Sequence, residues 1–396
     1  MNALLLLLLA TPQEWTRFRG PNGSGVSEAK GLPSAWSESD ILWKAELPGQ
    51  GHSQPVIWEE KLFVTVAKDE GKERALLAID KATGKTLWTK PYPMATHGKH
   101  KLNSFASSSA AVDKDRVYCA FVSAEQFVVR AFDHAGKELW ASPLGAYKSQ
   151  HGYGASPIIH EGTLIVTSDQ DAESFIAALD LKTGKPVWKS PRRNGDQTAA
   201  YGTPCVHQGQ LLTTSGSHGI AALDPKTGKQ LWEAKVFDKR AVSSPVVVGD
   251  LVFGSCGSGG GGNYVAAVKL GGKGDVTASH KAYEIRKAAP YVPTPVAQGD
   301  RLYLTADNGI ATCVKASTGD ILWSERVADG FYGSPVLAEG RVYVASTKGE
   351  MIVFAAADEF KVIARNPLGE GSHSTPCVDG SRLYIRTFTK LICVGK

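Results

Sequence analysis

The sequence predicts an all-β protein, an eight-bladed β-propeller of four-stranded antiparallel blades closed by the N-terminal strand. Two observations carry this prediction. A strand pattern recurs eight times at blade-like intervals, and the last repeat lacks one strand that the first repeat has in surplus. The composition agrees, because the 396 residues include 42 glycines and only 3 methionines, which favours turns over long helices.

Each repeat opens with a small or hydroxyl-bearing residue, usually followed by proline, a short apolar run, a turn and a second apolar run. Segments 244–253 and 334–343 are the clearest examples. The anchor positions are Pro55, Ala110, Pro157, Pro204, Pro245, Pro295, Pro335 and Pro376. Consecutive anchors lie about 46 residues apart on average, within the range of a four-stranded propeller blade.

The second half of a repeat carries an Asp-x-x-Thr-Gly-Lys hairpin followed by tryptophan, best seen in segment 224–232. Aspartate can bond to its own backbone two residues on, and glycine supplies a positive φ, so the motif predicts a tight turn. The hairpin recurs at Asp80, Asp133, Asp180 and Asp224, and we therefore predict turn residues there rather than catalytic bases. It decays in segments 267–274 and 354–363, which lack tryptophan.

The two ends of the chain predict how the ring closes. The last repeat stops at residues 391–394, one strand short, and the orphan segment 41–44 near the N-terminus matches the missing strand. Such closure removes free sheet edges. The predicted layout is therefore a candidate signal segment at 1–12, a leader at 13–40 that packs on the propeller, and the propeller itself at 41–396.

The first residues predict the location of the protein. Six leucines, residues 4–9, resemble the apolar part of a secretory signal and are too few to span a bilayer. No Lys or Arg precedes them and no A-x-A pattern follows, which leaves open an upstream start or an atypical signal. We expect an exported, periplasmic or envelope-associated monomer without a membrane span.

Charge and cysteine usage exclude several classes of protein. The 44 Lys and Arg exceed the 39 Asp and Glu by five and are scattered, so no nucleic-acid partner is expected. The cysteines are Cys119, Cys205, Cys256, Cys313, Cys377 and Cys393. Their spacing contains no zinc or haem motif, and a buried, unpaired role is favoured over disulfides.

One acidic cluster is a candidate for a metal site. Asp169, Asp171 and Glu173 could in principle serve Ca²⁺, but they lack the glycine and distant glutamate of a calcium loop. We predict a solvated hairpin tip there, and the sequence assigns no metal site. Segment 257–262 formally matches G-x-G-x-x-G, but no helix follows it, so a flexible hairpin loop is predicted.

The repeat resembles a known family, the pyrroloquinoline-quinone-like (PQQ-like) β-propeller repeat, with its A-x-D-x-x-T-G-K-x-x-W signature. The resemblance extends over residues 41–396. In that family the repeated tryptophan docks between neighbouring blades. The resemblance thereby assigns a structural role to Trp43, Trp88, Trp140, Trp188, Trp232 and Trp323.

The resemblance implies two functional classes. Quinoprotein alcohol and sugar dehydrogenases of the family hold PQQ and Ca²⁺, whereas proteins similar to the outer-membrane assembly factor BamB are non-catalytic scaffolds. The adjacent-cysteine disulfide and the haem site of the dehydrogenases are missing here. We predict a non-catalytic binding or assembly scaffold of the bacterial cell envelope, without a cofactor and with a protein or peptide partner. The alternative is a PQQ-dependent dehydrogenase, and glycan binding is a third possibility.

Residues just before the anchors form the predicted binding site. In a propeller these loops gather at one mouth of the channel, where aromatic and imidazole rings could line a small-molecule or peptide pocket. The candidates are His52, His151, Tyr153, Tyr201, Tyr291, Tyr332 and His373. The alternative is that these side chains only plug the channel.

The leader has a motif of its own. Segment 15–25 resembles the W-x-x-F-R-G-P-x-G-x-G leader found on some bacterial propellers of the family. Its aromatic residues predict that it packs across the propeller. Arg17 and Arg19 are predicted either to grip an anion or to pair with surface carboxylates.

Overall fold

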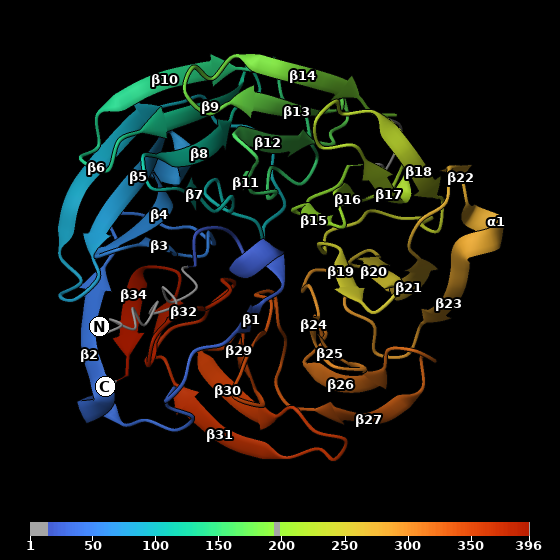
Figure 1. The fold of residues 1–396 in the computed structure, drawn as a ribbon. Helices are drawn as coiled ribbons and strands as arrows, with labels where there is room; N and C mark the ends of the chain where they lie inside the picture. Colours follow the sequence, from blue (N-terminus) through green and yellow to red (C-terminus); the bar gives the residue numbers. More distant parts are fainter. Residues whose placement is uncertain (1–14, 194–198, 396) are drawn as a thin grey trace, which may run out of the picture.

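The chain forms a ring of blades around a central channel (Figure 1). The computed structural model describes residues 15–193 and 199–395. Within these residues there are eight antiparallel blades of four strands each, and the eighth takes its outer strand from the N-terminal part of the chain, so the predicted fold is confirmed. No described helix is long and apolar enough to cross a membrane.

The first four blades contain β3 (Val56–Trp58), β4 (Lys61–Lys68), β5 (Glu73–Asp80), β6 (Thr86–Pro93); β7 (Ala111–Val112), β8 (Val117–Val122), β9 (Phe127–Phe132), β10 (Glu138–Pro143); β11 (Ile158–His160), β12 (Thr163–Ser168), β13 (Phe175–Asp180), β14 (Pro186–Pro191); and β15 (Cys205–His207), β16 (Gln210–Ser215), β17 (Gly219–Leu223), β18 (Gln230–Ala234). The next three contain β19 (Val246–Val248), β20 (Leu251–Cys256), β21 (Tyr264–Lys269), β23 (Lys281–Ile285); β24 (Val296–Gln298), β25 (Arg301–Thr305), β26 (Ile310–Lys315), β27 (Ile321–Arg326); and β28 (Val336–Ala338), β29 (Arg341–Ala345), β30 (Glu350–Ala355), β31 (Val362–Pro367). The eighth contains β32 (Cys377–Asp379), β33 (Arg382–Arg386), β34 (Lys390–Val394) and β2 (Ile41–Glu46).

Short elements decorate this ring. β1 (Val26–Ser27) pairs in parallel with β28, and β22 (Gly274–Asp275) pairs in parallel with β18. The remaining elements are η1 (Pro21–Gly23), η2 (Glu38–Asp40), η3 (Asp69–Gly71) and α1 (Thr277–His280).

The N-terminal strand closes the last blade as predicted. β2 pairs antiparallel with β34, with Trp43 opposite Cys393. Figure 1 shows the blue β2 beside the red β34. The two ends of the propeller therefore share one sheet, and the ring cannot open without breaking that sheet.

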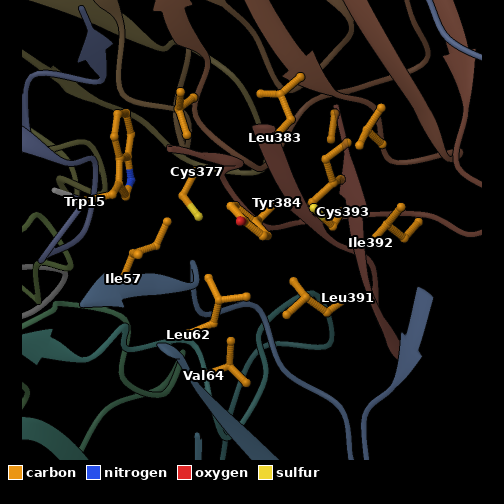
Figure 2. Close-up of a cluster of buried hydrophobic side chains, with 14 of the residues drawn as sticks. Trp15, Ile57, Leu62, Val64, Cys377, Leu383, Tyr384, Leu391, Ile392 and Cys393 are labelled. Carbon is orange, nitrogen blue, oxygen red and sulfur yellow. The ribbon is translucent and has the colours of Figure 1, made fainter. Parts of the chain in front are cut away.

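Apolar cores lie between successive blades. Figure 2 shows the core that contains Leu62 and Val64 of β4 together with Leu391 and Ile392 of β34, all at most 1% exposed. Burying such a side chain stabilises the fold by roughly 1.5–3 kcal/mol. All six cysteines are also buried and unpaired, as the sequence analysis predicted.

A ring of hydrogen bonds joins the blades around the channel. In seven of the eight joints, the backbone N–H of the residue before an anchor position donates to the hydroxyl of the equivalent residue in the next blade, over 2.8 to 3.0 Å. We call this ring the hydroxyl girdle, and its members are Gln54, Ser109, Ser156, Thr203, Ser244, Thr294, Ser334 and Thr375. All eight are at most 5% exposed, so water cannot replace these bonds.

The leader completes the girdle at its one member without a hydroxyl. The backbone N–H of Arg19 donates to Gln54 Oε1 over 2.5 Å, and Gln54 Nε2 donates to the carbonyl of Pro376. Figure 1 places this part of the leader at the centre of the ring. The leader also accepts a hydrogen bond from an inner strand, since the backbone N–H of Ile57 donates to the carbonyl of Trp15.

The two leader arginines bind backbone carbonyls, which corrects the prediction of an anion or a surface carboxylate. The Arg19 guanidinium, 0% exposed, donates to the carbonyls of Thr294, Pro295 and Pro335, and Arg17 Nη2 donates to that of Pro204 over 2.6 Å. Burial lowers the pKa of Arg19 to about 9, so it keeps its charge at neutral pH. Local sequence could not reveal these acceptors, which belong to residues far along the chain.

Outer joints come from the repeated tryptophans. Trp140 Nε1 donates to the carbonyl of Leu181 in the next blade over 3.0 Å, and its ring lies against Gly184 of that hairpin. The equivalent donors on Trp43, Trp88, Trp188 and Trp323 reach the hairpin of the next blade in the same way. The hairpin glycine has no side chain, so it leaves a flat surface on which the indole rests.

The hairpin aspartates also lie where the motif predicted. Asp80 Oδ1 accepts hydrogen bonds from both the backbone and the hydroxyl of Thr83, at 2.8 and 2.7 Å. These bonds, led by the Thr83 hydroxyl, lower the pKa of Asp80. A carboxylate engaged in this way holds the turn.

Three positions depart from the tryptophan pattern. Trp232 is 0% exposed but donates to Gln210 Oε1 of its own blade. Where the β19–β23 blade lacks tryptophan, the Tyr283 hydroxyl donates to the carbonyl of Ala316 in the next blade. In the β28–β31 blade Ala364 stands opposite Val353, and the leader residue Trp36 packs in the same cluster as Ala364. The decayed repeats therefore keep their joints with other aromatic residues.

The girdle predicts a large effect from removing one hydroxyl. Thr203→Val leaves the buried N–H of Ser156 without its acceptor at nearly unchanged volume, so we expect a loss of about 1–3 kcal/mol in the free energy of unfolding. Thr203→Ser keeps the hydroxyl and serves as the matched control. Urea unfolding measures both, and equal stability of the two variants would contradict the role of the bond.

The outer joint predicts a difference between two glycines of similar conformation. Gly184 has φ +70° and an added Cβ would lie 2.5 Å from Trp140 Cε3, whereas Gly162 has φ +81° and open space. Both alanine substitutions strain the backbone, by roughly 1–2 kcal/mol. Only Gly184→Ala also displaces the indole, so we expect it to be less stable than Gly162→Ala by about 1–3 kcal/mol. Thermal unfolding of both variants checks this, and equal melting temperatures would show that the indole contact adds nothing.

Candidate functional site

A cavity of about 550 Å³ lies at the mouth of the channel, and we call it the mouth cavity. Its floor includes Phe18 of the leader and four hydroxyl residues of the girdle. Among the predicted site residues, those that line it are His52, His151, Tyr201, Tyr291, Tyr332 and His373. These side chains meet because each stands three to six residues before an anchor, on the loop that leads into an inner strand.

One wall is a contiguous group of rings. The centroid of His373 lies 4.7 Å from that of Tyr332, 4.8 Å from that of His52 and 4.9 Å from that of Phe388. His373 Nδ1 lies 3.3 Å from the carbonyl of Leu102, which accepts from a protonated Nδ1. His373 Nε2 then carries the lone pair and can accept a hydrogen bond.

A second group of rings stands on other loops of the mouth. His100 and His151 stack with their centroids 5.5 Å apart, and Tyr201 lies edge-on to His151 at 6.3 Å. The Tyr201 hydroxyl is 3.1 Å from Ser149 Oγ. Both groups offer aromatic faces together with hydrogen-bonding edges, the combination that orients small ligands.

Three imidazoles of the cavity, those of His52, His151 and His373, have a lowered pKa and are neutral at pH 7. Burial lowers the pKa of His52 well below its ordinary value, and the nearby His373, Arg386 and Lys99 lower it further. Burial also lowers the pKa of His373 and of His151. The wall can therefore accept as well as donate hydrogen bonds.

Two charged residues complete the cavity. Arg240 is partly buried and its Nη2 donates to Gln150 Oε1 over 2.8 Å. Asp307 accepts from the backbone N–H groups of Tyr291 and Val292, and its burial raises its pKa. Asp307 thus fixes the loop that carries Tyr291, whereas Arg240 lines the cavity and bonds to Gln150.

Tyr153 lies outside the cavity, unlike the other predicted site residues. It is 7% exposed, packs against Phe127 at 5.1 Å and donates its hydroxyl to the carbonyl of Thr167. The anchor alignment brought it into the group because its neighbours in sequence face the mouth. Its own side chain points into the blade core.

In the acidic cluster predicted as a solvated hairpin tip, Asp171 and Glu173 are exposed as predicted, but Asp169 is buried, which corrects that part of the prediction. Asp169 is 6% exposed and accepts from Arg192 Nε over 3.2 Å. Asp171 and Glu173 turn to other partners, Gln150 N–H and Lys189. The sequence could not show that Arg192 reaches back across the blade to neutralise Asp169.

The donor set of the cavity does not match the acidic ligand set that Ca²⁺ prefers. Asp307 is the only carboxylate among its described lining residues, and both of its oxygens are engaged by backbone N–H groups. Across residues 15–193 and 199–395, no three His, Cys, Asp or Glu side chains converge on one point. The described lining therefore offers a calcium-bound quinone a single carboxylate, which is already engaged, and no cluster of acidic ligands.

Several cavity residues escaped the sequence analysis. Arg240 precedes the aligned position Val242 by only two residues, so a wider window would have found it. Asp307 lies on a hairpin between two strands, for which the alignment held no signal. Residues 258–262 were predicted to be a flexible loop, yet Ser258, Gly259 and Gly261 line the cavity.

The lowered pKa of His52 predicts how stability varies with pH. In the unfolded chain a histidine has a pKa of about 6.5, so below that pH the unfolded chain takes up a proton that the folded chain refuses. Stability present above pH 6.5 is therefore lost as the pH falls, by up to about 1.4 kcal/mol per pH unit for this group. His52→Gln removes that contribution. Chemical unfolding between pH 7.5 and 5 should show a shallower fall for the variant, and parallel profiles would refute the assignment.

The fold is shared with solved dehydrogenase structures. A europium-containing methanol dehydrogenase superposes with a TM-score of 0.72 at 12% identity, covering 95% of this chain and 89% of its own. The quinohemoprotein alcohol dehydrogenase from Comamonas testosteroni superposes with a TM-score of 0.70 at 14% identity, covering 97% and 81%. At these identities the similarity concerns the fold alone.

Sequence comparison gives a curated relative and a family. A polyvinylalcohol dehydrogenase from a Pseudomonas species is 25% identical over 203 residues, which is 46% of this chain and only 29% of that protein. The sequence model described as outer membrane protein assembly factor BamB matches segments 26–168, 124–190, 172–268 and 263–362. These matches extend over most of the propeller, and the chain belongs to this family of PQQ-like β-propellers.

Proposed function

We propose that this chain is a non-catalytic binding or assembly scaffold of the bacterial cell envelope that holds a protein or peptide partner at the mouth cavity. The observation that carries the proposal is the chemistry of that cavity. Aromatic and neutral imidazole rings line a well whose floor is built from buried structural groups. Such a surface recognises a ligand by contact and hydrogen bonding.

The rigidity of the mouth supports a binding role. Most rings of the cavity stand within a few positions of the hydroxyl girdle, whose members are all buried and are joined by hydrogen bonds at seven of the eight joints. Side chains mounted on such a ring are ordered before a ligand arrives, which reduces the entropy lost on binding. No part of this arrangement requires turnover.

The envelope location rests on two further observations. The leucine-rich segment at residues 4–9 has the character of a secretory signal, although it lies outside the described residues. The family model is described as an outer-membrane assembly factor. Both favour an exported protein.

A PQQ-dependent dehydrogenase acting on an alcohol or sugar is the alternative. The relatives named as alcohol or polyvinylalcohol dehydrogenases favour it. Against it stand the missing acidic ligand set and the hairpin roles of the repeated aspartates. A cofactor is therefore not part of the proposal.

A direct titration separates the two functions. PQQ and Ca²⁺ are added to the purified chain while tryptophan fluorescence and dye reduction are followed over a panel of alcohols and sugars. We expect neither saturable quenching nor dye reduction, because the cavity offers one carboxylate and its oxygens are engaged. Saturable quenching together with dye reduction would establish the dehydrogenase instead.

Site-specific photocross-linking in the envelope supplies the positive arm of this test. A photoreactive residue at Asn308, an exposed lining residue, should yield a discrete adduct, whereas the same residue at exposed Lys182 on an outer hairpin should not. Combined substitution of His52, Tyr201, Tyr332 and His373 should abolish the Asn308 adduct while circular dichroism remains unchanged. Persistence of the adduct in that folded variant would remove the mouth cavity from partner binding.

A further inference from the structure

The mouth cavity is a blind well. Its lining on the leader side consists of Phe18 and the girdle residues Ser244, Thr294, Ser334 and Thr375. Behind Phe18 the leader fills the centre of the ring, where the Arg19 guanidinium bonds to three blade carbonyls. A polypeptide therefore cannot pass through the channel beyond the leader, and a partner segment enters the cavity from the mouth side.

Arg240 supplies a positive charge at the side of this well. Among the described residues no carboxylate lies within ion-pair distance of its guanidinium, and its one side-chain bond goes to the neutral Gln150. The nearest rings, His151, Tyr201 and Tyr291, are uncharged at neutral pH. Toward the described residues the remaining N–H groups of Arg240 make no side-chain hydrogen bond, and their planar fork suits a carboxylate bound in a bidentate manner.

A glycine-rich turn with open space over it starts beside this arginine. Arg240 forms an isolated antiparallel bridge with Gly257, which places it at the base of the glycine-rich loop 258–262. A Cβ added at Gly259 or Gly261 would meet no atom within 4 Å, so the space over the loop is open. Lys239 Nζ donates to the carbonyl of Gly262 over 2.8 Å and tethers the loop. Glycine backbone exposed in this way lets another main chain approach closely.

We infer that the mouth cavity binds the C-terminal end of a partner polypeptide, with the terminal carboxylate on Arg240 and the preceding backbone along residues 258–262. The rings of Tyr201 and Tyr291 then face the last side chains. The inference rests on the proposed binding function and specifies which part of the partner enters. A saccharide carboxylate would satisfy Arg240 as well, but it would leave the open glycine backbone without a main-chain partner.

The test compares two peptide pools that differ only in the C-terminal group, which is a carboxylate in one pool and an amide in the other. A random pentapeptide pool is synthesised once with free C-terminal carboxylates and once as C-terminal amides, and both are passed over the immobilised full chain. Retained peptides are identified by mass spectrometry and their affinities measured by calorimetry. We expect the free acids to bind at least tenfold more tightly than their amides, because only the acid can pair with Arg240.

Three variants show whether Arg240 is the cause. Arg240→Gln should reduce the ratio of acid to amide affinity to about one, and Arg240→Lys should retain part of it because the charge remains. Lys182→Gln removes the same charge from an exposed outer hairpin and should leave the ratio unchanged. Melting curves confirm that each variant is folded, and the lysine variant keeps the test valid if the glutamine variant is unstable.

Three outcomes would overturn the inference. These are equal retention of acids and amides, acid selectivity that survives in folded Arg240→Gln, and retention of neither pool while galacturonate binds in an Arg240-dependent manner. Each can occur while the Asn308 cross-link persists and PQQ remains inactive, so the terminal-carboxylate inference can fail without the proposed scaffold function failing. Dye reduction with PQQ would instead remove the scaffold function itself.

Discussion

The ring depends on the hydroxyl girdle. Eight blades must meet around a narrow channel, where the backbone N–H before each anchor is turned inward and has no strand partner within its own blade. A buried N–H left unpaired is destabilising by about 1–3 kcal/mol. A serine or threonine in the next blade accepts it, as when Ser156 N–H donates to Thr203 Oγ1. The same hydroxyls therefore set the spacing of the blades and provide acceptors for the buried backbone N–H groups along the channel wall.

The girdle also explains why the leader is part of the fold. Gln54 is the member without a hydroxyl, and its amide bonds to both the Arg19 backbone and the carbonyl of Pro376. The Arg19 guanidinium then donates hydrogen bonds to backbone carbonyls of two other blades, those that begin with β24 and β28. At the periphery the indole and glycine joints hold the blades at a second radius, as between Trp140 and Gly184. Joints at two radii fix the inclination of each blade.

The functional site inherits this rigidity. His373, Tyr332 and His52 stand three residues before anchors, so the girdle sets their mutual distances. The leader turns the channel into a blind well, which restricts the occupant to a group that enters from one side. The exceptions to the repeat, Arg240 and the glycine-rich loop, face this opening. The residues that depart from the repeat pattern are thus found in the lining of the mouth cavity.

Local sequence determined the number of blades, the closure by the segment 41–44 and the turn role of the hairpin aspartates, because each follows from comparing one repeat with the others. It also placed most ring residues of the mouth, since their distance from an anchor is constant. Tertiary structure alone decided the partners of Arg19, the burial of Asp169 against Arg192, the inward orientation of Tyr153 and the arrival of Arg240 and Asp307 at the cavity. The physical reason is that these contacts join residues brought together by ring closure or by the packing of one blade, and no periodicity records which side chain will meet which carbonyl.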